Sequence, residues 1–352
     1  MSSLCTFDQL MAGPWGEIAP HYAGLRDEWL VVARSKDVAE NEVKKITLLG
    51  EDLVLWRSGG EVHCWKDLCI HRGARLSLGW VKEGNIVCPY HGWAFDGSAK
   101  CVKIPAHPDQ IPPLKARAFP HPVKEAYGFI WSSVGEPKQD VPPFPQWDDA
   151  SFRKVHAGPY FYKGDAMRTV ENFLDVAHFP YVHAGLNGYP GAPDPIEDYE
   201  VFERDGAICT SPIRVHQPYG DHRGIPVTSE YNFNCFRLLT AHFVKHTGPT
   251  ERFATYFNVT PVGPRDSIVW LIVAINFGED LTEEKILERQ DRVFEQDRLI
   301  VESQRPDALP TELTEELHVR CDKYAIEYRK WVKRAAERYR GTPQPKIKLR
   351  SV

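Results

Sequence analysis

The first third of the chain is a series of short apolar runs separated by turn residues. A Gly59-Gly60 pair stands between the first two of four such runs, which are Leu53–Trp56, Val62–Trp65, Asn85–Cys88 and Phe129–Trp131. Runs of this length, rich in β-branched and aromatic residues and bounded by glycine, are typical of strands joined by hairpins. The pattern predicts an antiparallel β domain between residues 29 and 134.

A different pattern follows a proline-rich segment at residues 137–145, which is typical of a stiff linker. The segments with helical periodicity beyond it are 169–177, 281–304 and 317–338. The segments that predict strands are 231–243, 253–259 and 268–277. The sequence therefore predicts a second region of α+β class, in which an antiparallel sheet is followed by helices. We expect one domain at 24–137, a linker at 138–146 and a second domain at 147–352.

Composition excludes several classes of protein. The net charge is -5 and both signs are interspersed, so there is no basic footprint for nucleic acid and no polybasic patch for a membrane. No apolar run is long enough to span a bilayer, and residues 1–20 lack a secretory pattern, so we expect a cytoplasmic protein. Eight cysteines in 352 residues are too sparse for a disulfide scaffold. A small soluble ligand is the expected partner.

Two of the cysteines belong to a paired motif. Cys69-Ile70-His71-Arg72-Gly73 and Cys88-Pro89-Tyr90-His91-Gly92 are separated by a loop, so a fold can bring them together. Two thiolates on one iron and two imidazoles on the other are the ligand set of a Rieske [2Fe-2S] centre. A structural zinc site of the Cys2His2 type, or four unrelated residues, are the alternatives. A Rieske centre absorbs visible light and zinc does not.

A second group of polar residues lies in the apolar run from Asn172 to His183. Asn172, Asp175 and His178 follow helical spacing and are expected on one side of a helix. Pro180 disfavours helix from Phe179 onward, so the chain is expected to bend and return His183 toward His178. Two imidazoles and one carboxylate on one side of a metal form the facial triad of non-heme Fe(II) oxygenases.

We place the third ligand at Asp297. In the predicted helix 281–304, four apolar residues lie three or four positions away from this aspartate: Val293, Phe294, Ile300 and Val301. Burying an ionised carboxylate on such a face is costly unless a cation compensates its charge. The alternatives are satisfied core histidines at 178 and 183 and a salt bridge from Asp297 to an arginine.

Both motifs and their order resemble the Rieske non-heme iron oxygenase family, and the closing segments Glu295-Gln296-Asp297 and Tyr328-Arg329-Lys330-Trp331 extend the similarity almost to the end of the chain. Respiratory Rieske proteins carry an extra cysteine in each loop, where this chain has Ala74 and Tyr90. The resemblance is therefore to the oxygenase branch.

This resemblance implies a Rieske domain followed by a helix-grip (START-like) catalytic domain, and a homotrimer. It implies that Cys69, His71, Cys88 and His91 hold the cluster and that His178, His183 and Asp297 bind iron. Asp175 would connect His178 with cluster ligand His71 or His91 of a neighbouring subunit, and Asn172 would lie near the iron. The length is similar to that of single-subunit N- and O-demethylases and of saxitoxin-pathway hydroxylases. Residues 101–113 and 144–149 especially resemble the last group.

The predicted function is that of an oxygenase component, a monooxygenase that hydroxylates or oxidatively demethylates a small aromatic, N-heterocyclic or alkaloid substrate. It would use O2 and electrons from an external NAD(P)H-dependent reductase or ferredoxin. Four cations near the cluster motif are candidates for docking that partner, or are simply solvated: Lys66, Arg72, Arg75 and Lys82. There are two competing classes, a Rieske electron carrier with an appended domain and a binding or scaffold protein. In both, the second domain would hold no metal. Leu186–Pro190 and the strands between Tyr231 and Phe277 are expected to line the pocket.

Overall fold

The computed structural model describes residues 22, 24–191, 193, 195–217 and 223–340. Three expectations lie outside this part of the chain. They concern Cys5, the lack of a secretory pattern in residues 1–20, and the end of the second domain at residues 341–352. None of the helices in the described part is long and apolar enough to cross a bilayer.

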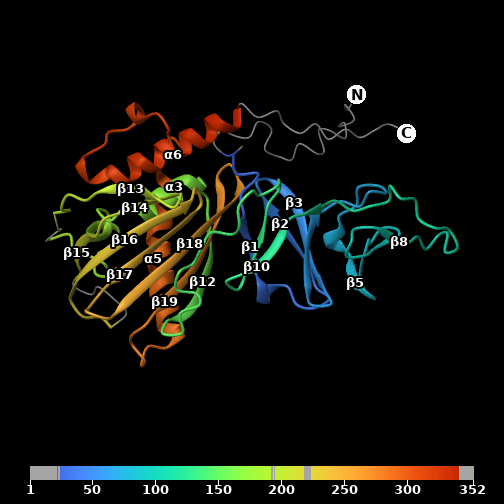
Figure 1. Cartoon of the computed structure of the whole chain (residues 1–352), viewed down its shortest axis with the longest axis horizontal. Helices are drawn as coiled ribbons and strands as arrows, with labels where there is room; N and C mark the ends of the chain where they lie inside the picture. The colour runs from blue at the N-terminus through green and yellow to red at the C-terminus, as the bar shows by residue number, and fades with distance from the viewer. Residues whose placement is uncertain (1–21, 23, 192, 194, 218–222, 341–352) are drawn as a thin grey trace.

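The N-terminal part consists of three small antiparallel sheets, as the spacing of its apolar runs predicts (Figure 1). The first has the order β1-β11-β10, from β1 (Leu30–Arg34), β10 (Val123–Ala126) and β11 (Phe129–Ser132). The second has the order β2-β3-β4-β9, from β2 (Val43–Leu48), β3 (Glu51–Ser58), β4 (Glu61–Lys66) and β9 (Pro120–His121). The third runs β5 (Trp80–Lys82), β6 (Asn85–Val87), β7 (Ala94–Phe95) and β8 (Cys101–Lys103). Gly59 and Gly60 both have positive φ and turn β3 into β4, as expected.

The C-terminal part is built on one eight-stranded antiparallel sheet of order β12-β19-β18-β17-β16-β14-β13, with β15 paired to β16. Its strands are β12 (Arg153–Tyr162), β13 (Val201–Arg204), β14 (Ala207–Thr210), β15 (Ile213–Gln217), β16 (Val227–Arg237), β17 (Thr240–His246), β18 (Arg252–Gly263) and β19 (Asp266–Ile275). The helices are α3 (Ala166–Leu174), α4 (Phe179–Val182), α5 (Glu283–Ser303) and α6 (Lys323–Arg340). The predicted α+β class and the order of sheet before helices are confirmed.

Two segments differ from the prediction. The segment 231–243 is two strands, because β16 ends at Arg237 and the chain turns at Leu238 and Leu239 before β17. The last helix starts at Lys323 and not at residue 317, since the segment before it forms the 3₁₀ turns Leu313–Glu315 and Arg320–Asp322.

The helices and the two parts of the chain share continuous cores. One apolar cluster contains Leu53 of β3 together with Val170 of α3, Phe257 of β18 and Tyr328 of α6. Another joins Trp131 of the first sheet to Tyr256 and Trp270 of the large sheet. The proline-rich segment is part of this packing. Phe144 is buried and stacks on Tyr256, whose hydroxyl donates to the carbonyl of Pro142 over 2.7 Å.

Candidate metal centres

Two loops of the N-terminal part have the same backbone geometry. In one, the amide of Cys69 donates to Ala74 and the carbonyl of Cys69 accepts from Gly73. In the other, Cys88 makes the matching bonds with Trp93 and Gly92. Gly73 and Gly92 both have positive φ, near +70°, which explains why each motif closes on glycine. The two C-to-G motifs therefore form a matched pair of loops, as their sequences predict.

The loops present their side chains in two layers. Cys69 and Cys88 are buried and their thiols interact with each other, which lowers the pKa of Cys88 and raises that of Cys69. His91 is exposed and His71 is partly exposed, and their Nδ1 atoms are 3.1 Å apart. Trp93 stacks on the ring of His71, with centroids 4.3 Å apart. The thiols thus form an inner pair and the imidazoles an outer pair.

This layered arrangement fits a two-iron cluster better than zinc. A tetrahedral zinc site would require the four ligand atoms to converge on a single point. In the described part of the chain, the only three ligand atoms of this kind within 4.8 Å of one another belong to His178, His183 and Asp297. Two separate pairs of donors are what the two irons of a Rieske centre require.

The second group of polar residues is arranged differently from the single helix predicted by its spacing. Helix α3 ends at Leu174, and Asp175 has extended backbone, with ψ of 143°. The carboxylate of Asp175 accepts the amides of Ala177 at 3.1 Å and His178 at 3.0 Å. Such side-chain bonds compete with helix formation, so Asp175 itself ends α3. The prediction of one helix through residue 177 was wrong for this reason.

Pro180 also behaves differently from the prediction. It does not prevent helix after Phe179, because it occupies the first turn of the short helix α4, where its missing N–H has no partner to lose. His178 precedes α4 and His183 follows it. This short helix brings the imidazole rings of the two histidines close together. The prediction that His183 returns to His178 is therefore confirmed.

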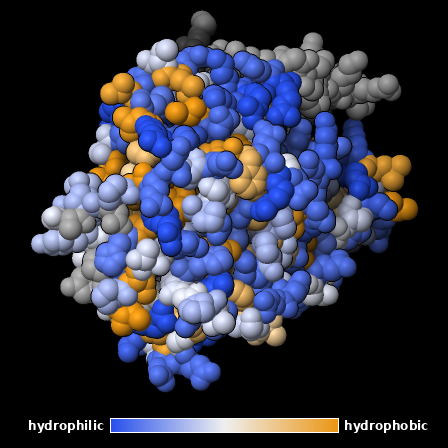
Figure 2. All heavy atoms as spheres, turned by 60° about the vertical axis from the view of Figure 1, so that its left-hand side comes forward, coloured by the Kyte–Doolittle hydropathy of each residue, from blue (hydrophilic) through white to orange (hydrophobic). Residues whose placement is uncertain are grey.

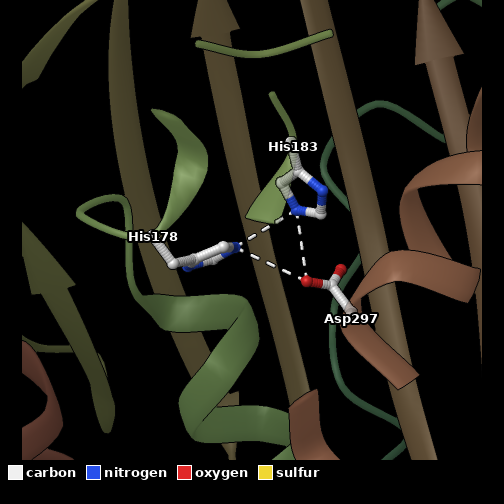
Figure 3. Close-up of side chains that lie close together, drawn as sticks. All are labelled: His178, His183 and Asp297. Atoms are coloured by element: carbon white, nitrogen blue, oxygen red, sulfur yellow. Dashed lines mark hydrogen bonds and ion pairs between the residues drawn. The ribbon is translucent and has the colours of Figure 1, made fainter. Parts of the chain in front are cut away.

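Asp297 reaches these histidines from α5 (Figure 3). Its Oδ1 atom lies 3.1 Å from Nε2 of His183 and 3.5 Å from Nε2 of His178, and the two Nε2 atoms are 3.2 Å apart. Asp297 is buried on the stripe Ile286, Gln290, Phe294, Asp297 and Val301. Ile300, which was expected on this face, is 44% exposed.

The remaining ring nitrogens of the two histidines have partners of their own. Nδ1 of His178 faces the Asp175 carboxylate at 2.7 Å, and Nδ1 of His183 faces Oε1 of Gln296 at 3.0 Å. Because each acceptor draws the ring proton to Nδ1, each neutral ring turns the lone pair of Nε2 toward Asp297. Oδ1 of Asp297 is buried and has no hydrogen-bond partner. Three lone pairs that face one another in a buried site fit a bound cation.

Without a cation in the site, the carboxylates favour a proton on the imidazole. Burial opposes a charge on His178, but Asp175 and Asp297 outweigh it and raise the pKa of His178 to about 9. Burial also raises the pKa of Asp297, while His178 and His183 lower it by more. The site therefore stabilises positive charge at the point between the three side chains.

A cavity of about 660 Å³, including its opening, lies against the triad. Asn172, Asn187, Tyr231 and the strands β17 and β18 contribute to its walls. The predicted lining is thus confirmed for Asn187 and for the strands up to β18, whereas β19 and the rest of Leu186–Pro190 are not among the described lining residues.

Sequence reasoning missed four polar residues at the site: Lys245, Arg289, Gln290 and Gln296. Gln290 was detectable, because it shares the buried stripe of α5 with Asp297. Lys245 follows Ala241 and Phe243 at alternate positions of β17, so it interrupts an apolar row. Gln296 and Arg289 carry no comparable signal.

Two family profiles match the chain. Residues 28–120 match the Rieske [2Fe-2S] domain, and residues 163–338 match the vanillate O-demethylase oxygenase C-terminal domain. The methylxanthine N1-demethylase NdmA of Pseudomonas putida is 30% identical over 304 residues, which are 85% of this chain and 84% of that protein. The chain belongs to the Rieske oxygenase family.

Solved structures agree with this assignment. NdmA with caffeine superposes with a TM-score of 0.81 at 26% identity, over 92% of this chain and 94% of that one. Dicamba monooxygenase bound to dicamba has the same fold, with a TM-score of 0.76 at 23% identity, over 90% and 99% of the two chains. The oxidoreductase NdmD of P. putida is 39% identical over 126 residues, 35% of this chain and 21% of that protein.

These comparisons confirm the predicted class of the protein. This Rieske oxygenase is an oxygen-dependent oxidoreductase, the oxygenase component of a monooxygenase system that acts on a small organic substrate and receives electrons from a reductase. Its cofactors are a Rieske [2Fe-2S] cluster and a mononuclear iron.

Proposed function

We propose that His178, His183 and Asp297 bind the mononuclear iron and that Cys69, His71, Cys88 and His91 hold the cluster. The observation that carries the proposal is the convergence of two Nε2 atoms and a partnerless buried carboxylate oxygen within 3.5 Å of one another. Metal–ligand bonds of about 2.1 Å at right angles separate ligand atoms by about 3 Å. When bound, the iron supplies oxygen activation and the cluster supplies electrons. A triad gathered in this way argues against a pure electron carrier or a scaffold.

The reaction that we propose is hydroxylation or oxidative demethylation. One atom of O2 enters a C–H bond of the substrate, and the other leaves as water with two electrons from the reductase and two protons. A hydroxylated methyl group on nitrogen or oxygen then departs as formaldehyde. Asn172 lines the pocket beside the triad and is proposed to contact substrate or oxygen there.

Asp175 is proposed to have two roles. Its carboxylate orients His178 through Nδ1, so that Nε2 points to the iron. Its side chain is 32% exposed, so it is also accessible from outside the subunit. In this proposal a cluster histidine of a neighbouring subunit, His71 or His91, bonds to the exposed side of Asp175.

A homotrimer is proposed, and the separation of the two centres supports electron transfer between its subunits. The cluster loops adjoin β5 and β8 at one end of the long axis, whereas α3 and α5 lie at the other end (Figure 1). Electron transfer slows steeply with distance, so transfer between subunits is favoured. Exposed apolar residues support contact at both places: Tyr90 packs against His91, and Tyr181 and Val319 share a groove with Val176 and Ala177, which follow Asp175. Apolar patches interrupt the otherwise hydrophilic face of the molecule in Figure 2.

The proposed domain limits are 24–137 for the Rieske domain and 147–352 for the catalytic domain, with 138–146 between them. These limits are supported by the end of β11 at Ser132 and the start of β12 at Arg153. The electron donor is proposed to be an NAD(P)H-dependent reductase, with or without a ferredoxin. Lys66, Arg72, Arg75 and Lys82 are its candidate docking residues.

Mixed assemblies test the proposal. A chain with Cys69→Ser and Cys88→Ser lacks the cluster, and a differently tagged chain with Asp297→Ala lacks the iron. Each variant alone should show no substrate-dependent O2 uptake, whereas assemblies purified through both tags should regain activity, because the cluster of one chain serves the iron of its neighbour. Mixed assemblies that contain both centres but stay inactive, or a wild-type protein that sediments as a monomer, would contradict transfer between subunits.

A further inference from the structure

Two tyrosines of β12 lie against α5, the helix that carries Asp297. They stand at alternate positions of the strand and therefore share its face toward the helix. The hydroxyl of Tyr162 donates to the carbonyl of Phe294 over 2.7 Å. The hydroxyl of Tyr160 donates to Oδ1 of Asp291 over 2.8 Å. Phe294 and Asp291 precede Asp297 by about one and two helical turns, so the two tyrosines follow the helix away from the proposed iron ligand.

These contacts form a continuous path from the substrate cavity to the surface. Phe294 lines the cavity, and its ring stacks on that of Tyr160 with centroids 4.6 Å apart. Tyr162 is buried; burial raises its pKa most, and the nearby charges of Asp297 and Tyr160 raise it further. At the outer end Asp291 is exposed and lines an open groove together with Tyr160. Electron transfer slows steeply with distance, so a path of touching groups favours transfer along it.

The two hydroxyls differ in the group that can accept their proton. Loss of one electron makes a tyrosine hydroxyl strongly acidic, so the oxidised ring gives its proton to a base within hydrogen-bond reach. The partner of Tyr162 is an amide carbonyl, which is a very weak base. The partner of Tyr160 is the carboxylate of Asp291, which takes a proton far more readily. An oxidised Tyr162 therefore takes an electron from Tyr160, and the oxidation comes to rest beside Asp291.

When no substrate occupies the cavity, an oxidant formed from O2 at the iron site attacks the surrounding side chains. Resting on the proposed iron site, we propose that Tyr162 and Tyr160 form a relay that returns one electron to that site, and that Asp291 takes the proton that Tyr160 releases. Tyr160 becomes a neutral phenoxyl radical, Asp291 becomes a carboxylic acid, and Tyr162 is regenerated. A dissolved reductant such as ascorbate then gives one electron to Tyr160 in the groove, and the proton returns from Asp291.

Electron paramagnetic resonance of rapidly frozen samples tests the relay. Hydrogen peroxide is added to the iron-loaded protein with its cluster oxidised and without substrate. The wild type should develop the spectrum of a phenoxyl radical, which incorporation of ring-deuterated tyrosine narrows. Tyr160→Phe keeps the ring that stacks on Phe294 and should abolish the signal. Asp291→Asn should lower it at least about tenfold, because an amide does not take the proton. Glu288→Gln removes an exposed carboxylate from the same groove and should leave the signal unchanged.

Oxidative damage inside the cavity gives a second readout. After repeated additions of peroxide, peptide mass spectrometry should find more oxidised side chains around the cavity in Tyr160→Phe than in the wild type. Tyr162→Phe interrupts the inner step of the relay, so it should show the same damage together with a weaker radical signal. Ascorbate should protect the wild type and not the two variants, because the relay is the route by which its electrons reach the iron site.

Three results would overturn the inference: no radical in the iron-loaded wild type, an equal radical in Tyr160→Phe, or the same radical in Asp297→Ala, which lacks the iron. Equal damage in the wild type and in Tyr160→Phe would do so as well. Iron content is measured on the same samples. If the triad holds iron but no tyrosine radical forms, the proposed function stands and only the relay is wrong. If the triad holds no iron, both are wrong.

Discussion

The imidazole of His183 donates its Nδ1 proton to the side-chain carbonyl of Gln296, over 3.0 Å. Gln296 immediately precedes Asp297 on α5, so one helix supplies both a proposed iron ligand and the group that orients another. The ring of His183 is buried, and this bond fixes which nitrogen faces the metal. The spacing between the two histidines thus sets only part of the geometry of the site.

Gln296→Leu should weaken iron binding by about 10- to 100-fold, because the ring of His183 loses the acceptor that fixes its tautomer. The measurement is iron retained against a chelator, with the visible spectrum of the cluster as an internal reference. Gln296→Glu keeps an acceptor and should retain iron better than the leucine variant. Equal iron retention in all three proteins would show that Gln296 does not orient the ligand.

Asp175→Asn should leave both metal centres occupied while steady-state turnover falls by about 10- to 100-fold or more. The side-chain carbonyl of asparagine can still accept the Nδ1 proton of His178, which keeps the iron in place, but it lacks the negative charge proposed to connect His178 with a neighbouring cluster. Iron analysis and reductase-coupled O2 uptake measure the two effects. Glu197→Gln removes a charge from the exposed groove beside Asp175 and serves as the control. Normal turnover in the Asp175 variant would refute the bridge.

Gly188→Ala should lower the iron content selectively. A Cβ at this position would lie 2.5 Å from Cα and 2.7 Å from N of Pro180, in the helix that connects the two histidines. Gly185 has φ of +78° but open space around it, so Gly185→Ala introduces only backbone strain of about 1–2 kcal/mol. We expect the cluster spectrum to be normal in both variants and the iron content to fall only in the first. Full iron occupancy in Gly188→Ala would mean that α4 tolerates displacement.

Much of the site could be predicted because its residues are close in the sequence or follow a clear period. Cys69 to Gly73 and Cys88 to Gly92 are each a local loop, and the buried stripe of α5 identifies Asp297. The ends of the helices were harder to predict from the sequence. Asp175 ends α3 with its own side chain, and Pro180 stands in a first helical turn, so neither follows from apolar spacing alone.

A buried charge cluster fixes α3 against α6, and it should make stability dependent on pH. Glu316 pairs with Arg168 at 2.7 Å and Arg329 at 2.5 Å, and both guanidiniums are buried. Burial raises the pKa of Glu316, but the two arginines outweigh it, and the pKa lies below its ordinary 4.5. A carboxylate with a lowered pKa stabilises the fold above the ordinary value, and this contribution is lost as the pH falls through the folded-state pKa.

Glu316→Gln should therefore reduce the free energy of unfolding by about 1–3 kcal/mol at neutral pH. The difference from wild type should persist down to pH 4.5 and shrink below it. Urea unfolding followed by circular dichroism measures the difference across this range. A difference that stays constant below pH 4.5, or one that grows, would contradict the ion-pair account.

Contacts between distant segments were beyond prediction from one sequence. Gln296 orients His183 across more than one hundred residues, and Lys245 joins Phe253 and Tyr231 only through sheet register. Register and helix placement arise from tertiary packing, which local periodicity does not contain. Only the folded chain brings Lys245 of β17 and Gln290 of α5 to the same cavity.

The measurement that tests the account most directly is the number of irons per chain in the wild type and in Asp297→Ala. The account predicts three irons in the wild type and two in the variant, with the visible absorption and electron paramagnetic resonance of the cluster the same in both. A variant that keeps three irons, or a wild type that binds no iron beyond its cluster, would contradict a second metal centre at His178, His183 and Asp297.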